Sequence, residues 1–410
     1  MSRREKIAWV LFGAASVQLA FLHPYIILVR GERTNLFSGL LCLVALSGAL
    51  FLGKKNGLRF KSPEVLFSLV LAALAVVSGL LSITPLSTSF RVFSLLASGL
   101  GGFWCARLLL NTPDGQRRFE VLALFLLAGV ILLSFTGYFL SSNIDMVFRT
   151  KNTHPLANTI MLLSFAPIVL LFSPSRPRKL LGLGLLLAGY VILCVSERLS
   201  VVFIPMVACL LWALFGVLRW RYLLLTLIAT GLITGYYSHQ LLWFKLSKEY
   251  PYYRIENLPF SWSIARQHPI FGIGVRAPRE EFLKDYNPRY PYVSKEKFTQ
   301  DIREIVSADN IFVTFMTGLG IPFLIIYSIA LILLLIRLLG ITFKPPPGLA
   351  YPPLALLLPL AMALMHFQLY DGLLFAQNSW FFHILLGLIP VPAHKMEESG
   401  ICEKAQLIGT

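Results

Sequence analysis

The sequence predicts an all-α fold: a polytopic transmembrane helical bundle of about twelve spans with one long, partly helical loop outside the membrane. Hydrophobic residues make up 56% of the 410 positions and charged residues only 14%, too little polar surface to cover a water-exposed globule. Apolar windows of roughly 20 residues, the length that crosses a hydrocarbon core of about 30 Å, recur from one end of the chain to the other. Because these runs are unbroken, they favour helices over a barrel.

The twelve predicted spans follow one another with short connections, apart from one long gap after residue 238. Their bounds are 7–29, 35–53, 62–84, 91–111, 118–140, 155–173, 179–196, 199–218, 221–238, 310–338, 349–370 and 374–392. The three spans between 179 and 238 are nearly continuous, so their limits are the least sharply defined. The first span is too long for a signal-peptide core and lacks a small-residue cleavage pattern, which predicts an uncleaved helix.

The distribution of Lys and Arg predicts the orientation of the bundle under the positive-inside rule. With the N-terminus in the cytoplasm, 19 of the 36 basic residues fall on the inner side. The short outer loops then hold only Arg30, Arg33, Arg91, Arg149, Lys151 and Arg198. The remaining 11 lie in the long outer segment, which the rule does not count because long loops translocate regardless of charge. Both termini are therefore predicted to be cytoplasmic.

This orientation divides the chain into four regions. They are helices 1–9 in 1–238, an outer loop domain in 239–309, helices 10–12 in 310–392 and a cytoplasmic tail in 393–410. The loop domain is rich in Tyr, Pro, Arg, Lys and Glu, and short helices are predicted near 259–267 and 280–285. A loop this long is usually functional or disordered. Its many aromatic residues argue against disorder and suit a layer at the membrane interface.

Charge and cysteine content narrow the classes of function. The net charge of +16 does not indicate nucleic-acid binding, because the positive-inside signal explains about half of the basic residues. The outer loops are also basic, mainly through Arg, whose planar guanidinium suits recognition of phosphate or carboxylate. Cys42, Cys105, Cys194 and Cys209 fall within apolar spans and Cys402 in the tail, so we expect no disulfide in the outer loop.

Four polar clusters lie on the predicted outer side. The first is 148–158, Phe-Arg-Thr-Lys-Asn-Thr-His-Pro-Leu-Ala-Asn, which enters the sixth span. The second is 196–200, Ser-Glu-Arg-Leu-Ser, in a very short turn. The third combines Arg254 and Trp262 with 268–274, His-Pro-Ile-Phe-Gly-Ile-Gly. The fourth combines 307–312, Ser-Ala-Asp-Asn-Ile-Phe, with 317–322, Thr-Gly-Leu-Gly-Ile-Pro.

The basic residues of these clusters each have a structural interpretation beside a functional one. Arg198 either extends to the lipid headgroups or pairs with Glu197, or it binds an anion, which its place in so tight a turn favours. Several arginines of the long loop are expected to be merely solvated or lipid-facing, and the same ambiguity applies to Arg149 and Lys151. The arginines in question are Arg254, Arg266, Arg276, Arg279, Arg289 and Arg303.

The histidines and the acid of the fourth cluster differ in what they predict. His154 and His268 each precede a proline, which favours capping or hydrogen-bonding roles. His366 and His383 lie in the last two spans, where packing or a hydrogen bond accounts for them. Asp309 stands at the mouth of a span, where an acid must be solvated, paired or functional; its structural alternative is the N-cap of the tenth helix.

In this order, the clusters resemble the O-antigen ligase and O-antigen polymerase superfamily, membrane enzymes of lipopolysaccharide and related surface-glycan assembly. The resemblance rests on the turn at 196–198, on Arg254 eight residues before Trp262, and on 268–274. It also rests on a polar pair that opens a helix containing Gly-Leu-Gly at 318–320, and it covers about 145–340. One departure is clear: where the family usually carries a histidine as the acceptor-activating residue, this sequence has Asp309.

The resemblance implies a glycan donor on an undecaprenyl pyrophosphate carrier and an acceptor that is lipid A core or a second carrier-linked glycan. Arg198 and Arg254 would bind the pyrophosphate on the periplasmic face of the bacterial inner membrane, and Asp309 would deprotonate the acceptor hydroxyl, giving inversion. Further substrate contacts are expected from Arg149, Lys151, His154, Arg266 and Asn310. Because the leaving group is already activated, we expect neither a metal nor another cofactor; membrane lipid is the remaining partner.

Two other classes stay open beside the ligase, which is slightly favoured over a polymerase. A transporter of lipid-linked glycans usually has polar or broken helices at mid-membrane. The mid-span positions here look overwhelmingly apolar, with polar residues at the outer face, which favours an enzyme. A structural scaffold predicts instead that Arg198 and Arg254 can be replaced without loss of function.

Overall fold

The computed structural model describes most of the predicted spans. The described residues are 2–22, 33–53, 63–82, 85–141, 154–195, 261–262, 264–275, 310–346, 349, 351–368 and 372–390. Within these ranges the secondary structure is helical and contains no strand, which confirms the all-α class. The predicted spans 199–218 and 221–238, and most of the loop domain, lie outside the described residues.

The helices follow the predicted spans closely in the first half of the chain. They are α1 Arg3–Val17 with a π-helical continuation η1 Gln18–Leu22, α3 Arg33–Gly53, α4 Pro63–Leu80, α5 Pro85–Leu109, α6 Pro113–Ser141, α8 His154–Leu163, α9 Phe165–Leu171 and α10 Arg176–Val195. The second half contains α16 Ile311–Leu319, α17 Ile321–Phe343, α18 Pro353–Phe367, the 3₁₀ turn η3 Gly372–Leu374 and α19 Ala376–Gly387.

Local sequence explains where several helices begin. The Ser2 hydroxyl accepts from the Glu5 amide and the Glu5 carboxylate accepts from the Ser2 amide, which is a capping box at the start of α1. Proline is the first residue of α4, α5, α6 and α18, where its missing N–H has no helical partner to lose.

Four described helices are long and apolar enough to cross a membrane: Pro63–Leu80, Ser89–Leu109, Pro113–Thr136 and Ile321–Phe343. Shorter apolar helices lie at Phe37–Phe51, Pro155–Leu171 and Pro353–Phe367. The candidate span in α17 has only 17% of its residues buried, so its apolar side chains face outward as lipid contact requires. These helices identify an integral membrane protein, and the full set of twelve spans stays a prediction.

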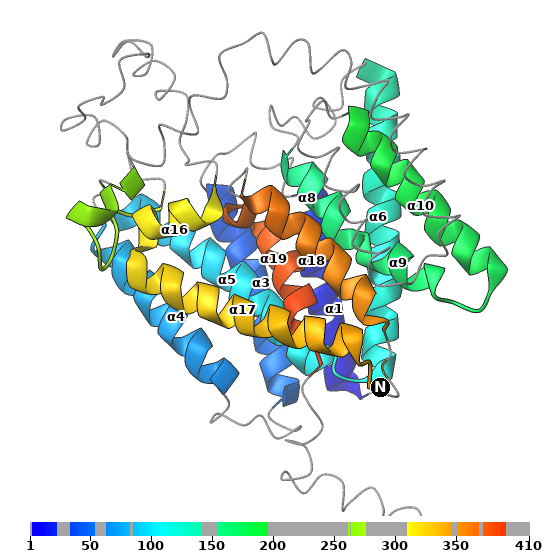
Figure 1. Cartoon of the computed structure of the whole chain (residues 1–410), viewed down its shortest axis with the longest axis horizontal. Helices are drawn as coiled ribbons and strands as arrows, with labels where there is room; N and C mark the ends of the chain where they lie inside the picture. Colours follow the sequence, from blue (N-terminus) through cyan, green and yellow to red (C-terminus); the bar gives the residue numbers. More distant parts are fainter. Residues whose placement is uncertain are drawn as a thin grey trace, which may run out of the picture.

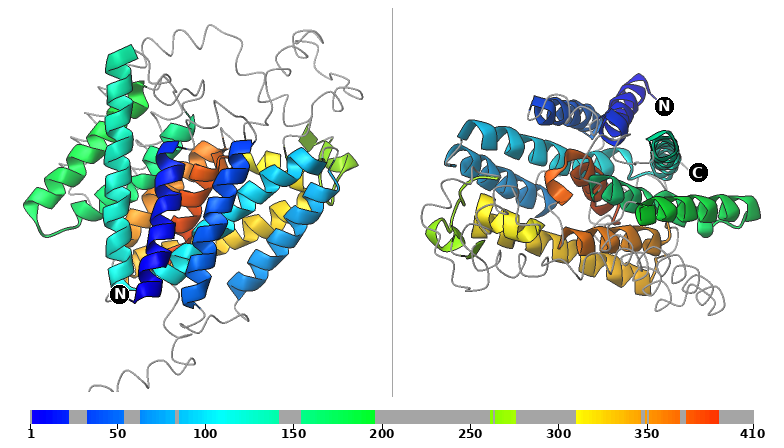
Figure 2. Two further views of the ribbon diagram at one scale, coloured as in Figure 1. Left: turned by 180° about the vertical axis from the view of Figure 1, so that it is seen from behind. Right: turned by 90° about the horizontal axis from the view of Figure 1, so that it is seen from above.

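The core of the bundle is built around α19. Every residue from Ala376 to Gly387 in this helix is buried, and the Trp380 ring lies 5.7 Å from the Phe12 ring of α1. Helix α19 packs against α5 and α8, and α5 in turn packs against α3 and α4. Seen from above, α19 lies between the side formed by α1 and α3 and the side formed by α17 and α18 (Figure 2). A helix that is buried on all sides is thus surrounded by helices with exposed apolar faces.

The predicted tenth span, 310–338, is wrong as a single helix. The chain turns at Gly320, and α16 folds back along α17 (Figure 1). The Phe315 ring lies 5.2 Å from the Tyr327 ring, whereas twelve residues of a continuous helix would separate them by about 18 Å. Gly320 has φ of +90°, a left-handed conformation that ends α16 before α17 begins.

The predicted sixth span, 155–173, is also interrupted. Helices α8 and α9 meet at Ser164, and Pro167 has no amide hydrogen to donate to the carbonyl of Leu163. The Ser164 hydroxyl instead donates to the Met161 carbonyl at 2.6 Å. A proline and a serine within the apolar run Pro155–Leu171 therefore interrupt the helix locally, while backbone bonds from Ser164 to Ile160 and from Ile168 to Ser164 keep α8 and α9 consecutive.

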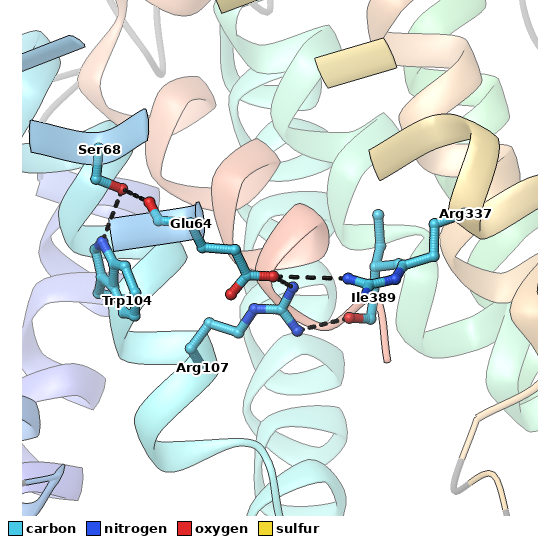
Figure 3. A network of polar contacts seen from close by, with 6 residues as sticks. All are labelled: Glu64, Ser68, Trp104, Arg107, Arg337 and Ile389. Carbon is cyan, nitrogen blue, oxygen red and sulfur yellow. Dashed lines mark hydrogen bonds and ion pairs between the residues drawn. The ribbon is translucent and has the colours of Figure 1, made fainter. Parts of the chain in front are cut away.

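Charged side chains join several helices at one end of the bundle (Figure 3). We call Glu64 of α4, Arg107 of α5 and Arg337 of α17 the charged network. Arg107 donates to the Glu64 carboxylate at 2.8 Å and to the Ile389 carbonyl at 2.6 Å. The Arg337 guanidinium lies 3.6 Å from the same Glu64 oxygen. The network links three helices to the end of α19, and the predicted orientation puts it on the cytoplasmic side.

Candidate functional site

Two sequence clusters that are separate along the chain meet at the opposite end of α4. The Ile273 amide donates to the Thr317 carbonyl at 2.9 Å, and the Gly274 amide donates to the Gly318 carbonyl at 3.0 Å. The Ile321 amide donates to the Pro269 carbonyl at 2.9 Å. These bonds form what we call the loop–α16 junction, the contact between residues 269–275 and 317–321. The structure thus brings together the 268–274 and 317–322 motifs on which the family resemblance rests.

Glycines make this close approach of two backbones possible. Gly272 has φ of +63°, and a Cβ there would lie 2.5 Å from the Thr317 carbonyl oxygen. A Cβ on Gly320 would collide with the carbonyl of Ile270. A Cβ on Gly318 would lie 3.1 Å from the Cα of Val275. The Gly-x-Gly pairs in both motifs are therefore packing requirements of the same junction.

Side chains of α4 and α5 donate hydrogen bonds to carbonyl groups of the junction. The hydroxyl of Ser78, which is fully buried on α4, donates to the Phe271 carbonyl and lies 3.1 Å from the Gly318 carbonyl oxygen. Arg91 of α5 donates to the Val275 carbonyl at 3.3 Å. Arg91 was assigned from the sequence to a short outer loop, and the structure places it on α5 beside the junction.

The other end of α16 is fixed by Asn310. Its side-chain oxygen accepts from the amides of Phe312 at 3.0 Å and Val313 at 3.2 Å, while its amide nitrogen donates to the Gln368 carbonyl at 3.2 Å. The N-cap of α16 is therefore Asn310. The alternative interpretation of Asp309 as this N-cap is wrong, because its neighbour occupies the position. Asp309 itself lies outside the described residues.

Buried polar side chains lie where α8, α18 and α19 meet. His366 and Asn158, both with 0% exposure, are joined by a 2.7 Å bond between Nδ1 and Oδ1. The hydroxyl of Thr159 donates to the Pro155 carbonyl at 2.9 Å and lies 3.3 Å from Asn378 Oδ1. The amide nitrogens of Asn158 and Asn378 and the Gln377 oxygen are buried and find no hydrogen-bond partner among the described residues.

These buried groups qualify the expectation that polar residues gather only at the outer face. Gln377, Asn378, Ser379 and His383 all lie inside the predicted span 374–392 and are buried. His383 Nδ1 donates to the Ser379 carbonyl at 2.7 Å, and its Nε2 lies 3.3 Å from the Tyr327 hydroxyl. Of the two explanations predicted for His366 and His383, packing or a hydrogen bond, the structure shows hydrogen bonds for both. The polar residues inside the predicted span 374–392 were a sequence signal for this buried cluster, because polar residues in an apolar span usually face the bundle interior.

Most of the other predicted site residues cannot be compared with the structure. Arg149, Lys151, Arg198 and Arg254 lie outside the described residues, and His154 is described only as the first residue of α8. Arg266 is exposed, and its guanidinium carbon lies 5.5 Å from the centroid of the Trp262 ring. The structure therefore brings together the backbone of two motifs and leaves the proposed ionic groups as predictions.

The apolar helices, the folded-back α16 and the loop–α16 junction define a helical membrane protein in which two of the predicted polar clusters meet. Residues 159–328 match the O-antigen ligase family, and this match confirms the resemblance to the O-antigen ligase and polymerase superfamily. The matched segment includes both sides of the loop–α16 junction. No curated protein matches the chain. The family indicates a ligase- or polymerase-type function in the assembly of lipopolysaccharide or a related glycan.

Proposed function

We propose that this protein is an O-antigen ligase-like glycosyltransferase that moves a glycan from undecaprenyl pyrophosphate to lipid A core. The observation that carries the proposal is the family match over 159–328, whose two glycine-containing motifs are bonded to each other at the loop–α16 junction. The reaction takes place on the periplasmic face of the bacterial inner membrane, with both termini in the cytoplasm. A multi-pass bundle in that orientation puts the junction on the outer side and the charged network on the inner side.

The proposed reaction is a single displacement at the anomeric carbon. The Asp309 carboxylate takes the proton of the acceptor hydroxyl as its oxygen forms the new glycosidic bond, and the bond to the pyrophosphate breaks with its electron pair on the leaving oxygen. Arg198 and Arg254 bind the pyrophosphate and stabilise the charge that develops there. The product has inverted configuration. No metal or nucleotide is invoked, because the pyrophosphate already activates the donor.

The residue that follows Asp309 in the chain, Asn310, supports the proposed role of Asp309 as the base. Asp309 directly precedes Asn310, whose side chain caps α16 and bonds to Gln368 after α18. The backbone on one side of the carboxylate is therefore fixed by contacts with two elements. Arg149, Lys151, His154 and Arg266 are proposed to bind the glycan or phosphate groups of the two substrates.

Two alternatives remain beside the ligase. An O-antigen or exopolysaccharide polymerase would use the same chemistry with a carrier-linked glycan as acceptor. A transporter of lipid-linked glycans gains support from the buried polar groups of α19, because transporters often have polar groups near mid-membrane. Transfer chemistry distinguishes the first two, and the absence of any transfer favours the third.

The test is glycan transfer by the reconstituted protein, with a carrier-linked donor and lipid A core as acceptor. We expect wild type to form the lipid A product and folded Arg198→Ala, Arg254→Ala and Asp309→Ala variants to lose it. Elongation of the carrier-linked glycan without transfer to lipid A would identify a polymerase. Transfer to neither acceptor contradicts the enzyme proposal, and full activity in both Arg variants contradicts the pyrophosphate-binding role assigned to these arginines.

A further inference from the structure

Ser78 differs from the buried serines Ser98 and Ser134 in where its hydroxyl donates. A serine inside a helix commonly donates to the carbonyl four residues earlier in the same helix. Ser98 does so to Ser94 at 2.7 Å, and Ser134 does so to Val130 at 2.7 Å. The Ser78 hydroxyl instead meets the carbonyls of Phe271 and Gly318, which are 193 and 240 residues further along the chain.

The two carbonyls belong to the two sides of the loop–α16 junction. Phe271 lies in the loop segment, and Gly318 lies in the last turn of α16, where its carbonyl also accepts from the Gly274 amide. A single hydroxyl on α4 therefore lies between both family motifs, although α4 precedes the segment that matches the family. Ser78 has 0% exposure, so its side chain is shielded from bulk solvent.

We propose that Ser78 is a positioning residue for the transfer reaction. This inference rests on the proposed function. Helix α16 is held at its C-terminal end by Ser78 and the junction, and at its N-terminal end by the bonds between Asn310 and Gln368. Nine helical residues form a rod of about 13 Å, so a displacement at Gly318 is transmitted to Asn310 and to Asp309 beside it.

The chemistry explains why the hydroxyl matters more than the volume of the side chain. Replacing Ser78 with Ala removes this donor from the part-buried Phe271 carbonyl, and an acceptor that loses its donor favours movement of the segment toward other partners. A displacement of about 1 Å at a reacting group lowers turnover by up to about a hundredfold, because the reacting atoms lose alignment. Binding of the donor depends on other groups, so its KM is expected to change little.

The experiment compares wild type, Ser78→Ala and Ser98→Ala in the full-length reconstituted protein. Ser98 is also fully buried, and its hydroxyl bonds within its own helix, which makes it a matched control. We expect Ser78→Ala to lower kcat about tenfold with KM for the carrier-linked donor within about twofold of wild type. Amide hydrogen exchange in peptides covering 269–275 and 311–321 should be faster in Ser78→Ala, whereas Ser98→Ala should match wild type in both measurements.

Each other outcome has a definite meaning. Equal kcat in Ser78→Ala and Ser98→Ala overturns the positioning role, whether or not exchange changes. If Ser78→Ala does not fold, Ser78→Cys supplies a similar shape with a weaker donor; an intermediate kcat supports the role and a wild-type kcat overturns it. If wild type transfers a glycan to neither acceptor, the proposed function fails, and the role of Ser78 in transfer fails with it. Faster exchange in Ser78→Ala would then identify a purely structural contact.

Discussion

The two ends of α4 contact the rest of the bundle through different kinds of interaction, ion pairs at one end and hydrogen bonds to backbone carbonyls at the other. At its first turn, Glu64 belongs to the charged network and meets the guanidinium groups of two other helices. About 21 Å further along the helix, Ser78 meets backbone carbonyls of the loop–α16 junction. The first contact depends on long side chains, and the second depends on a short hydroxyl and on glycines that let backbones approach. Of the family motifs, the two that the structure describes meet at the second end.

This difference separates what each region does. A charged network tolerates small shifts, because long side chains adjust and carboxylate and guanidinium groups interact over several ångströms. The junction has no such freedom, since its bonds join main chain to main chain and its glycines have no side chain to move. We therefore expect substitutions in the charged network to act mainly on stability and substitutions at the junction to act mainly on transfer.

The largest effect on stability is expected from Arg107→Ala. This side chain has 11% exposure and bonds to both Glu64 and Ile389, so its loss leaves a partly buried carboxylate with a single weak partner. Breaking a buried ion pair costs about 3–5 kcal/mol. Thermal unfolding in detergent should show a large drop in the midpoint, with activity per folded molecule retained. The half-buried Arg337→Ala serves as the control and should lower the midpoint less; an equal drop in both variants would contradict the assigned geometry.

Gly320→Ala tests the junction, where we expect a large effect on transfer rather than on stability. A left-handed conformation in a residue other than glycine costs about 1–3 kcal/mol, and the added Cβ also meets the Ile270 carbonyl. We expect transfer to be nearly abolished while the remaining helices stay folded by circular dichroism. Gly340→Ala in α17 is the matched control, because a Cβ there meets nothing within 4 Å. Normal transfer by Gly320→Ala would mean that the fold-back of α16 is not needed for function.

Asn310 allows the cap of α16 to be separated from a direct role in binding. Loss of an N-cap costs about 0.5–2 kcal/mol, so Asn310→Ala should lower stability and transfer together. Asn310→Ser keeps a capping oxygen but removes the amide that donates to Gln368. Stability close to wild type with reduced transfer in the Ser variant would assign a role in transfer to the amide, either through its bond to Gln368 or through the substrate. Recovery of both properties would assign Asn310 to the cap alone.

The smallest structural effect is expected from Arg266→Gln. Its guanidinium is exposed beside Trp262, and such an exposed cation–π contact contributes about 0.5–1 kcal/mol at most. The unfolding midpoint should therefore barely change. A rise in KM for the carrier-linked donor would support the proposed phosphate or glycan contact, and an unchanged KM would leave Arg266 a surface residue. Kinetics at two salt concentrations provide the check, because an ionic contact weakens as salt rises.

The sequence predicted individual helices well where hydropathy and capping agree. The predicted 35–53 and 62–84 correspond to α3 Arg33–Gly53 and α4 Pro63–Leu80. The prediction of a single span at 310–338 is wrong, because the mean hydropathy stays high through the point where the chain reverses direction. The reversal is stabilised by contacts with the carbonyl and amide groups of 269–274. The sequence of 310–338 alone does not reveal these contacts. The succession Gly-x-Gly-Ile-Pro at 318–322 was the available local signal.

For the site, the order of motifs along the chain predicted which segments matter, and the structure added how they touch. Ser78 was not singled out, since a serine in an apolar span usually bonds within its own helix. Packing and a hydrogen bond are both compatible with His366 in the sequence, and its partner Asn158, in the first cluster, cannot be inferred from spacing. Contacts between residues this far apart in sequence depend on the packing of whole helices rather than on any local pattern.

The fold-back at Gly320 also bears on how many times the chain changes sides. At nine residues, α16 is about 13 Å long and cannot cross a hydrocarbon core of about 30 Å, whereas α17, at 23 residues, is about 34 Å long and can. The predicted tenth span, although divided into α16 and α17, therefore still crosses the membrane once. A reporter inserted before Asn310 and one inserted after Lys344 should therefore still be found on opposite faces of the membrane.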